Sequence, residues 1–174
     1  RSLMSTRGVI VLGSGKRVRE TALPAFASLG GRFEVRSVFA RTAKEIVSAG
    51  RTYRVRPIRE LDAAEMAAAS LVYVAVGKDA VPEVLARLAT FDRSRLALLI
   101  DTPVVRFKNF RHVALLRGFA AASVAEDTST LPWYDTVRAS VASGAIGDLC
   151  RVVFERSAYA YHGIAMAKSL LASD

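Results

Sequence analysis

The stretch GVIVLGSG, residues 8–15, determines how the rest of the chain is interpreted. It opens on a short apolar run rich in β-branched residues, which is typical of a buried strand, and the two glycines after it favour a tight turn. Residues 18–29 then show helical spacing, although Pro24 lies inside them. A buried strand, a glycine turn and a helix are the first unit of an alternating α/β fold.

The same alternation continues along the chain. Strands are predicted at residues 8–12, 33–40, 53–55, 71–76, 95–100 and 119–125, and helices at 18–29, 42–50, 62–69, 79–91, 108–117 and 132–143. Asp62 is the predicted N-cap of one helix, and Pro132 opens another. This order predicts a Rossmann-type, doubly wound parallel sheet with both faces covered, which we assign to residues 8–127.

A second unit is predicted over residues 128–174. After a linker helix, LCRVVFER (149–156) is predicted as a strand and YHGIAMAKSLL (161–171) as a helix. A strand and a helix alone bury little surface, so we expect the beginning of an α+β domain, either truncated or completed by a partner. Cys150 is expected to be buried in the strand and inert.

Composition excludes several classes of protein. With 52% hydrophobic residues among 174, the chain has ample material for a core, and disorder is disfavoured. No apolar stretch is long enough to cross a bilayer, and no signal-peptide pattern is present, so a cytoplasmic protein without membrane contact is expected. One cysteine and two histidines predict no metal site.

The net charge of +9 is concentrated in one part of the chain. Residues 1–61 hold 13 Lys/Arg and 4 Asp/Glu, whereas residues 62–174 hold 12 of each. A local basic field indicates an anionic ligand or nucleic acid, and a solvated Arg-rich surface would give the same count. Nucleic acid is the weaker hypothesis, because the arginines lie on several predicted elements and no recognition motif is present.

The glycine turn is the first candidate binding site. A strand followed by Gly13-x-Gly15 and a helix is the dinucleotide-binding context, in which the first glycine makes the turn and the second lets the backbone approach a pyrophosphate. Val18 occupies the third position of that fingerprint, where Gly or Ala is usual. Any strand-to-helix turn would also use glycine. The loop residues assigned to the cofactor are Gly13, Ser14, Gly15, Lys16 and Arg17.

The end of the strand at 33–40 indicates which dinucleotide is bound. An acidic residue there would hydrogen-bond a ribose hydroxyl, but the strand is followed by Arg41 and Thr42. These two residues, with Arg17, suit a 2′-phosphate, so the sequence favours NADP and leaves NAD open. A solvated arginine after a strand is the alternative.

Six segments, taken together, resemble the Gfo/Idh/MocA family, named for glucose–fructose oxidoreductase and inositol dehydrogenase. They are GSGKRVRETALPAF (13–26), VFART (38–42), VYVAVGKDAVPEVLARL (72–88), LLIDTPV (98–104), VAED (124–127) and LPWYDTVRASVASGAIGDLCRVVF (131–154). The resemblance implies a Rossmann domain that binds NAD(P) and a second domain that supports substrate binding and homo-oligomer contacts. It also implies redox chemistry at a hydroxyl-bearing carbon of a sugar-like small molecule.

The resemblance extends the cofactor site to Val76 and Gly77 and to the end of the strand at 95–100. There the family has Glu-Lys-Pro, with the lysine beside the nicotinamide, and this chain has Asp101, Thr102 and Pro103. A hydroxyl orients a substrate but does not supply the ammonium that stabilises an alkoxide.

A second family pattern places an aspartate four residues before a histidine. Here the histidine is His162, a candidate general acid or base, and Ala158 occupies the aspartate position. The catalytic candidates are therefore Thr102, His162 and Tyr161, a tyrosine for which packing is the alternative role. Two hypotheses stay open: an NADP(H)-dependent oxidoreductase, and a catalytically inactive NADP-binding sensor or partner subunit.

Overall fold

The computed structural model describes residues 6–155 and 159–171, and the chain divides into two compact units between Val124 and Ala125. The strands are β1 (Arg7–Leu12), β2 (Phe33–Ala40), β3 (Lys44–Ser48), β4 (Arg51–Pro57), β5 (Leu71–Val74), β6 (Ala97–Asp101) and β7 (Ala121–Ala125). The α-helices are α1 (Leu23–Ser28), α2 (Ala63–Ala68), α3 (Val81–Leu88), α4 (Pro132–Ala142) and α5 (Ala160–Leu171). Shorter helical segments are a π-helical turn at Val18–Ala22 and 3₁₀ segments at Ile58–Glu60, Phe107–Gly118 and Thr128–Thr130.

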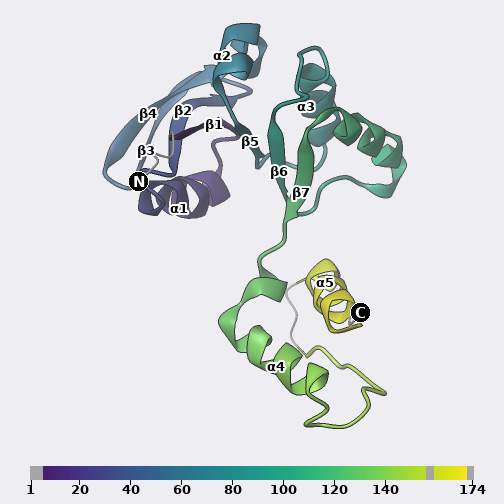
Figure 1. Cartoon of the computed structure of the whole chain (residues 1–174). Coiled ribbons are helices and arrows are strands. Elements are labelled where there is room, and N and C mark those ends of the chain that lie inside the picture. Colours follow the sequence, from purple (N-terminus) through teal and green to yellow (C-terminus); the bar gives the residue numbers. More distant parts are fainter. Residues whose placement is uncertain (1–5, 156–158, 172–174) are drawn as a thin grey trace. The chain divides into compact units, whose positions relative to one another are not determined.

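Within the described residues, the strands form one seven-stranded sheet in the order β3-β4-β2-β1-β5-β6-β7 (Figure 1). β1 pairs in parallel with both β2 and β5, and β4 and β6 continue the parallel arrangement on either side. β1 is therefore the point from which the sheet grows in two directions, where ligands bind in open α/β sheets. The predicted doubly wound α/β fold is confirmed.

Both faces of the central strands are covered. Ile10 and Leu12 of β1 belong to a buried cluster with Met66 of α2 and with four buried residues of α3. On α1, Phe26 makes an edge-on ring contact of 5.9 Å with Tyr73 of β5. Because successive side chains of a strand point to opposite faces, a strand buried on both faces carries an uninterrupted apolar run, as β1 does.

Pro24 lies in the first turn of α1, directly after the π-helical turn at Val18–Ala22. Proline has no N–H to donate, and its ring crowds the preceding turn of an α-helix. The preceding backbone is widened, since the Leu23 N–H bonds to the carbonyl of Val18. The helical segment therefore continues through the proline, as the sequence predicted for residues 18–29.

The helix predicted at residues 42–50 is wrong. This segment forms β3, an antiparallel edge strand that pairs with β4 through a two-residue turn at Ala49 and Gly50. Ile46 and Ser48 alternate toward the interior, and the Ser48 hydroxyl donates to the backbone carbonyl of Arg19. β4 is correspondingly longer than the predicted strand at 53–55.

The second unit contains α4, α5 and a small core of its own. Tyr134, Met166 and Leu170 are buried together, and Val152 and Phe154 pack against them. The Tyr134 hydroxyl donates to the backbone carbonyl of Met166 on α5. This hydrogen bond satisfies the polar end of a fully buried tyrosine, as a buried hydroxyl requires.

The strand predicted at residues 149–156 is wrong over the residues that the structure describes. Residues 149–155 form no ladder with another strand, although Val152 and Phe154 are half-buried. Cys150 is exposed, not buried as expected. Of the described helices, none has both the length and the apolar character needed to span a membrane.

The β3–β4 turn predicts a stabilising substitution. Ala49 has a φ of +49° and Gly50 a φ of +73°, the combination that favours Asn-Gly in two-residue hairpins. We expect Ala49→Asn to raise the free energy of unfolding by about 0.5–1 kcal/mol, because asparagine tolerates left-handed backbone better than alanine. Urea unfolding followed by circular dichroism measures the change.

Thr52→Asn introduces the same side chain on the neighbouring exposed strand position and serves as the control. We expect it to lower stability slightly, because asparagine is disfavoured in strands. Equal effects at the two positions would contradict the role assigned to the turn.

Candidate functional site

Gly13 is the point at which the ends of three strands meet. Its N–H donates to the Phe39 carbonyl of β2 at 2.7 Å, and the Ala75 N–H donates to the Leu12 carbonyl of β1 at 2.8 Å. Its φ is +131°, and a Cβ at this position would lie 2.1 Å from the carbonyl oxygen of Ala75. Only glycine meets both requirements.

Gly15 lies in a different environment. A Cβ added there would have no heavy atom within 4 Å, and the helical residues begin directly after it at Lys16. Backbone N–H groups at the start of a helix, facing open space, suit an anion. The geometry therefore leaves room for a phosphate group beside the glycine loop.

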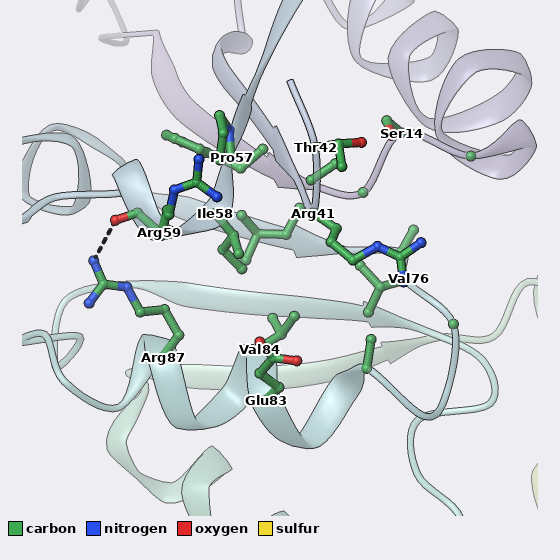
Figure 2. A pocket seen from close by; sticks show the side chains of 18 of the residues that line it. Ser14, Arg41, Thr42, Pro57, Ile58, Arg59, Val76, Glu83, Val84 and Arg87 are labelled. Carbon is green, nitrogen blue, oxygen red and sulfur yellow. Dashed lines mark hydrogen bonds between the residues drawn. The ribbon is translucent and has the colours of Figure 1, made fainter. Parts of the chain in front are cut away.

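A cavity of about 870 Å³ opens at the carboxyl ends of the strands (Figure 2). The segments that line it are distant in sequence, and they include the glycine loop, the end of β2 and the segment after β5. The residues assigned to the cofactor from the sequence that line it are Gly13, Ser14, Gly15, Arg41, Thr42, Val76 and Gly77. The structure thus brings most of the predicted set around one cavity, while their role in binding stays a prediction.

Other residues that line the cavity were not anticipated. Pro57 ends β4, and Ile58 and Arg59 follow it, while α3 contributes Glu83, Val84 and Arg87. Figure 2 shows Ile58 and Val84 on opposite sides of the space, with Arg59 and Arg87 at one end. The parallel register pairs Ala40 with Pro57, which puts residue 58 next to Arg41. The pairing of β2 with β4 was not predicted, because residues 42–50 between them were predicted as a helix.

The charges around the cavity are predominantly positive. Arg41, Lys44 and Arg59 line it, and the carboxylate of Asp79 is paired with Arg106 at 2.8 Å. Arg87 has a structural role, because its guanidinium donates to the carbonyl oxygens of Leu61 at 2.6 Å and Arg59 at 3.3 Å. Part of the basic excess of the first third therefore faces this cavity, which favours an anionic ligand.

The remaining predicted cofactor residues lie outside the lining of the cavity. Lys16 pairs with Glu20 on the helix surface at 3.8 Å, and Arg17 pairs with Asp101, at the end of β6, at 3.4 Å. Thr102 and Pro103 follow β6 and are joined by a cis peptide bond. Arg17 thus links the glycine loop to the strand end that carries Thr102.

His162 lies in the first turn of α5, within the second unit. Its Nδ1 is 2.8 and 3.0 Å from the two carboxylate oxygens of Glu126 and 3.0 Å from the hydroxyl of Thr128. The backbone N–H of Thr128 donates to Glu126 at 3.0 Å. Glu126 was not among the predicted catalytic residues, and its separation of 36 residues from His162 left no local signal.

The surroundings of Glu126 act on its pKa in opposite directions. Burial is the largest influence and raises the pKa of this carboxyl, while hydrogen bonds from Thr128 and His162 lower it. The hydrogen bonds together prevail, so the pKa lies below the ordinary value. Glu126 is therefore a carboxylate at neutral pH.

Tyr161 lies against His162, with 4.3 Å between their ring centroids, and stacks on Tyr159. These contacts explain the position of the Tyr161 ring by packing alone. The role of Tyr161 as a proton donor stays a prediction. Ala158, the position at which the family pattern places an aspartate, is outside the described residues.

Neither a protein-family model nor a curated protein matches the chain. Solved structures with a similar fold do match. An oxidoreductase from Thermotoga maritima is 18% identical over 83% of this chain and 45% of its own, with a TM-score of 0.63. The 3-ketoreductase KijD10 from Actinomadura kijaniata, solved with TDP-benzene and NADP, is 18% identical over 83% of this chain and 46% of its own, with a TM-score of 0.60.

A Rex-family repressor is also similar, at 11% identity over 79% of this chain and 61% of its own, with a TM-score of 0.56. At such identities the similarity shows the fold alone. The chain spans about half the length of the two oxidoreductases that it matches. The presence of a repressor among the neighbours agrees with the general rule that a fold does not determine a function.

The two loop glycines predict different results for the same substitution to alanine. Gly13→Ala forces a Cβ against the Ala75 carbonyl and a strained φ, and we expect a loss of about 3 kcal/mol in the free energy of unfolding. Gly15→Ala meets open space, so we expect unchanged stability and weaker binding of a dinucleotide phosphate.

Circular dichroism during urea unfolding measures the stability of both variants, because the single tryptophan, Trp133, lies in the second unit and does not report on this loop. A Gly13→Ala protein as stable as the parent would contradict the contact described here.

Proposed function

We propose that this chain binds NADP(H) in the cavity of its first unit and belongs to an oxidoreductase. The reaction is hydride transfer to or from a carbonyl or alcohol carbon of a small, sugar-like substrate. One observation carries the proposal: the cavity joins an open glycine loop to Arg41 and Thr42 at the end of β2. That combination fits the pyrophosphate and the 2′-phosphate of NADP.

The glycine loop fits the pyrophosphate. The space in front of Gly15 is open, and the first N–H groups of a helix have no partner within the helix. A side chain at residue 15 would fill the volume that a phosphate needs. The loop therefore supplies neutral backbone hydrogen-bond donors. The positive charge of the lining comes from other segments, through Arg41, Lys44 and Arg59.

The other end of the cavity fits an adenosine with a 2′-phosphate. Ile58 and Val84 offer apolar surface on opposite sides for a planar base (Figure 2). Arg41 and Thr42 lie at the end of β2, where an acidic residue would repel this phosphate, and Lys44 and Arg59 add positive charge. These four side chains are hydrogen-bond donors that line the cavity, three of them cationic, and they favour NADP over NAD.

Nicotinamide, when bound, supplies the hydride donor or acceptor. The residues of this chain contribute orientation and proton transfer. In the proposal, the Thr102 hydroxyl orients the substrate by hydrogen bonding and His162 transfers the proton. Tyr161 is the second candidate for the proton. The homo-oligomer expected from the resemblance is part of the proposal for the whole protein.

Arg41 provides the test of cofactor preference. Removing a charge-assisted hydrogen bond costs about 1.5–3 kcal/mol, which corresponds to about 10- to 150-fold in affinity. We expect Arg41→Ala to weaken NADPH binding by this factor and NADH binding much less, measured by titration calorimetry. Arg54→Ala, an exposed arginine of β4 that does not line the cavity, is the matched control. Equal losses for both nucleotides would contradict the 2′-phosphate assignment, and no NADPH binding at millimolar concentration would reject the proposed function.

A second candidate is an NADP-binding sensor or partner subunit without turnover. The observation that favours it is the end of β6, where Thr102 stands at the position of the family lysine and Asp101 pairs with Arg17. No ammonium group is contributed by residues 101–103.

Thr102→Lys distinguishes the two candidates. For an inactive NADP-binding protein, we expect tight NADPH binding, no oxidation of NADPH or reduction of NADP across a panel of polyols and carbonyls, and measurable turnover only after the substitution. For an oxidoreductase adapted to Thr102, the parent protein turns over and Thr102→Lys lowers the rate. Absorbance of NADPH follows both, and Thr102→Ser, which keeps the hydroxyl, is the control.

A further inference from the structure

The second unit contains a polar cluster that connects two elements far apart in the sequence. Glu126 and Thr128 lie where the chain enters the unit, and His162 lies in the first turn of α5. All three side chains meet at one ring atom, Nδ1 of His162, through the contacts of 2.8–3.0 Å described above. The cluster is partly enclosed, because the side chains of His162 and Glu126 are only 20% and 12% exposed.

The contacts determine which ring nitrogen carries a proton. A carboxylate only accepts hydrogen bonds, so Nδ1 must be the donor toward Glu126. In the neutral ring the other nitrogen, Nε2, then keeps its lone pair. An isolated neutral histidine in water prefers the proton on Nε2. The cluster therefore selects the other tautomer, with the proton on Nδ1.

A buried ion pair of this kind is weak evidence of a stabilising role. Burying a charged pair costs desolvation energy, and replacing such a pair by apolar side chains is often neutral or stabilising. Glu126 nevertheless stays ionised, since its hydrogen bonds lower its pKa despite burial. A carboxylate that is kept charged beside one ring nitrogen prepares the other nitrogen to accept a proton.

We propose that Glu126 is a positioning residue for His162 and that Nε2 of His162 is the proton-accepting atom. In the step, the Nε2 lone pair takes the proton of a substrate hydroxyl. The O–H bond breaks, its electron pair stays on oxygen, and the imidazolium that forms is neutralised by Glu126. The reverse step returns the proton to oxygen. The inference rests on the oxidoreductase function proposed above, which requires a proton acceptor for an alcohol substrate.

The first test is the ring ¹⁵N spectrum of the histidines, recorded where the rings are neutral. The chain has two histidines, and His112 is an internal control because its Nδ1 faces the carbonyl oxygen of Asn109 at 3.0 Å. We expect His162 to carry its proton on Nδ1 in the parent protein. In Glu126→Gln we expect a several-fold rise in the form protonated on Nε2, with His112 unchanged. A parent protein with His162 protonated on Nε2 would overturn the inference.

The second test is acylation of the folded protein by diethyl pyrocarbonate, which attacks the lone pair of a neutral imidazole. We expect His162 to be modified at Nε2 and the rate to fall several-fold in Glu126→Gln, while Glu126→Asp, which keeps the carboxylate, retains most of it. A purely structural clamp predicts slow modification of His162 that is insensitive to residue 126, and that result would overturn the inference.

Both readouts are independent of NADP and of a substrate. If NADPH does not bind, the proposed function is rejected and these two measurements keep their meaning. If His162 of the parent protein carries its proton on Nε2, the role inferred for Glu126 is rejected, whatever the result of NADPH binding. If Glu126→Gln does not fold, the tautomer and the acylated atom of the parent protein still decide the matter.

Discussion

The backbone of Gly13 packs against the carbonyl oxygen of Ala75, and the cavity depends on this contact. A side chain there would come within 2.1 Å of that oxygen, so the ends of β1 and β5 approach one another only because residue 13 is glycine. The hydrogen bond from Gly13 to Phe39 brings in β2. Once these strand ends are held together, the loop at 13–15, the end of β2 and the segment after β5 surround one space, and the helical residues begin directly after Gly15.

The basic charge of the first third has two different uses. Some arginines hold the fold together: Arg56 pairs with Glu65 while its guanidinium lies 4.6 Å from the centre of the Phe39 ring. Others, above all Arg41, face the cavity. The net charge of the sequence does not separate these uses, because both raise the same sum. The separation follows from the β3–β4 hairpin, which forms one edge of the sheet: Lys44, at the start of β3, and Arg59, just after β4, line the same cavity as Arg41. Strand pairing therefore decides which of the basic side chains of the first third line the cavity.

The elements that the sequence predicted well are those in which burial dictates the pattern. Residues 9–12 of β1 are apolar because both faces of the strand are covered, and glycine is required at residue 13 by the turn that follows. Residues 42–50 were mistaken for a helix because Ala, Lys and Glu favour helices, whereas pairing with β4 and burial of Ile46 and Ser48 override that propensity. LCRVVFER (149–156) was predicted as a strand, but over the described residues 149–155 no strand lies beside it, and Val152 and Phe154 instead pack against the core of the second unit. Glu126 was not assigned a catalytic role because nothing local connects it to His162, which is 36 residues away.

The two departures from the family pattern concern the same chemical problem. When a hydroxyl loses its proton, the developing negative charge on oxygen needs either a cation beside it or a base that removes the proton as the charge forms. At the end of β6 the chain has Thr102 in place of a cation, and Arg17 is there neutralised by Asp101. Residues 101–103 thus provide no cation to stabilise the developing negative charge. The second is available to a histidine whose imidazolium is balanced by a carboxylate, and Glu126 provides that carboxylate within hydrogen-bonding distance of His162. In the proposed oxidoreductase, threonine at residue 102 therefore leaves one route without its cation, whereas the proposed Glu126–His162 pair supplies the other. The absence of a lysine alone thus does not make the inactive alternative the stronger hypothesis.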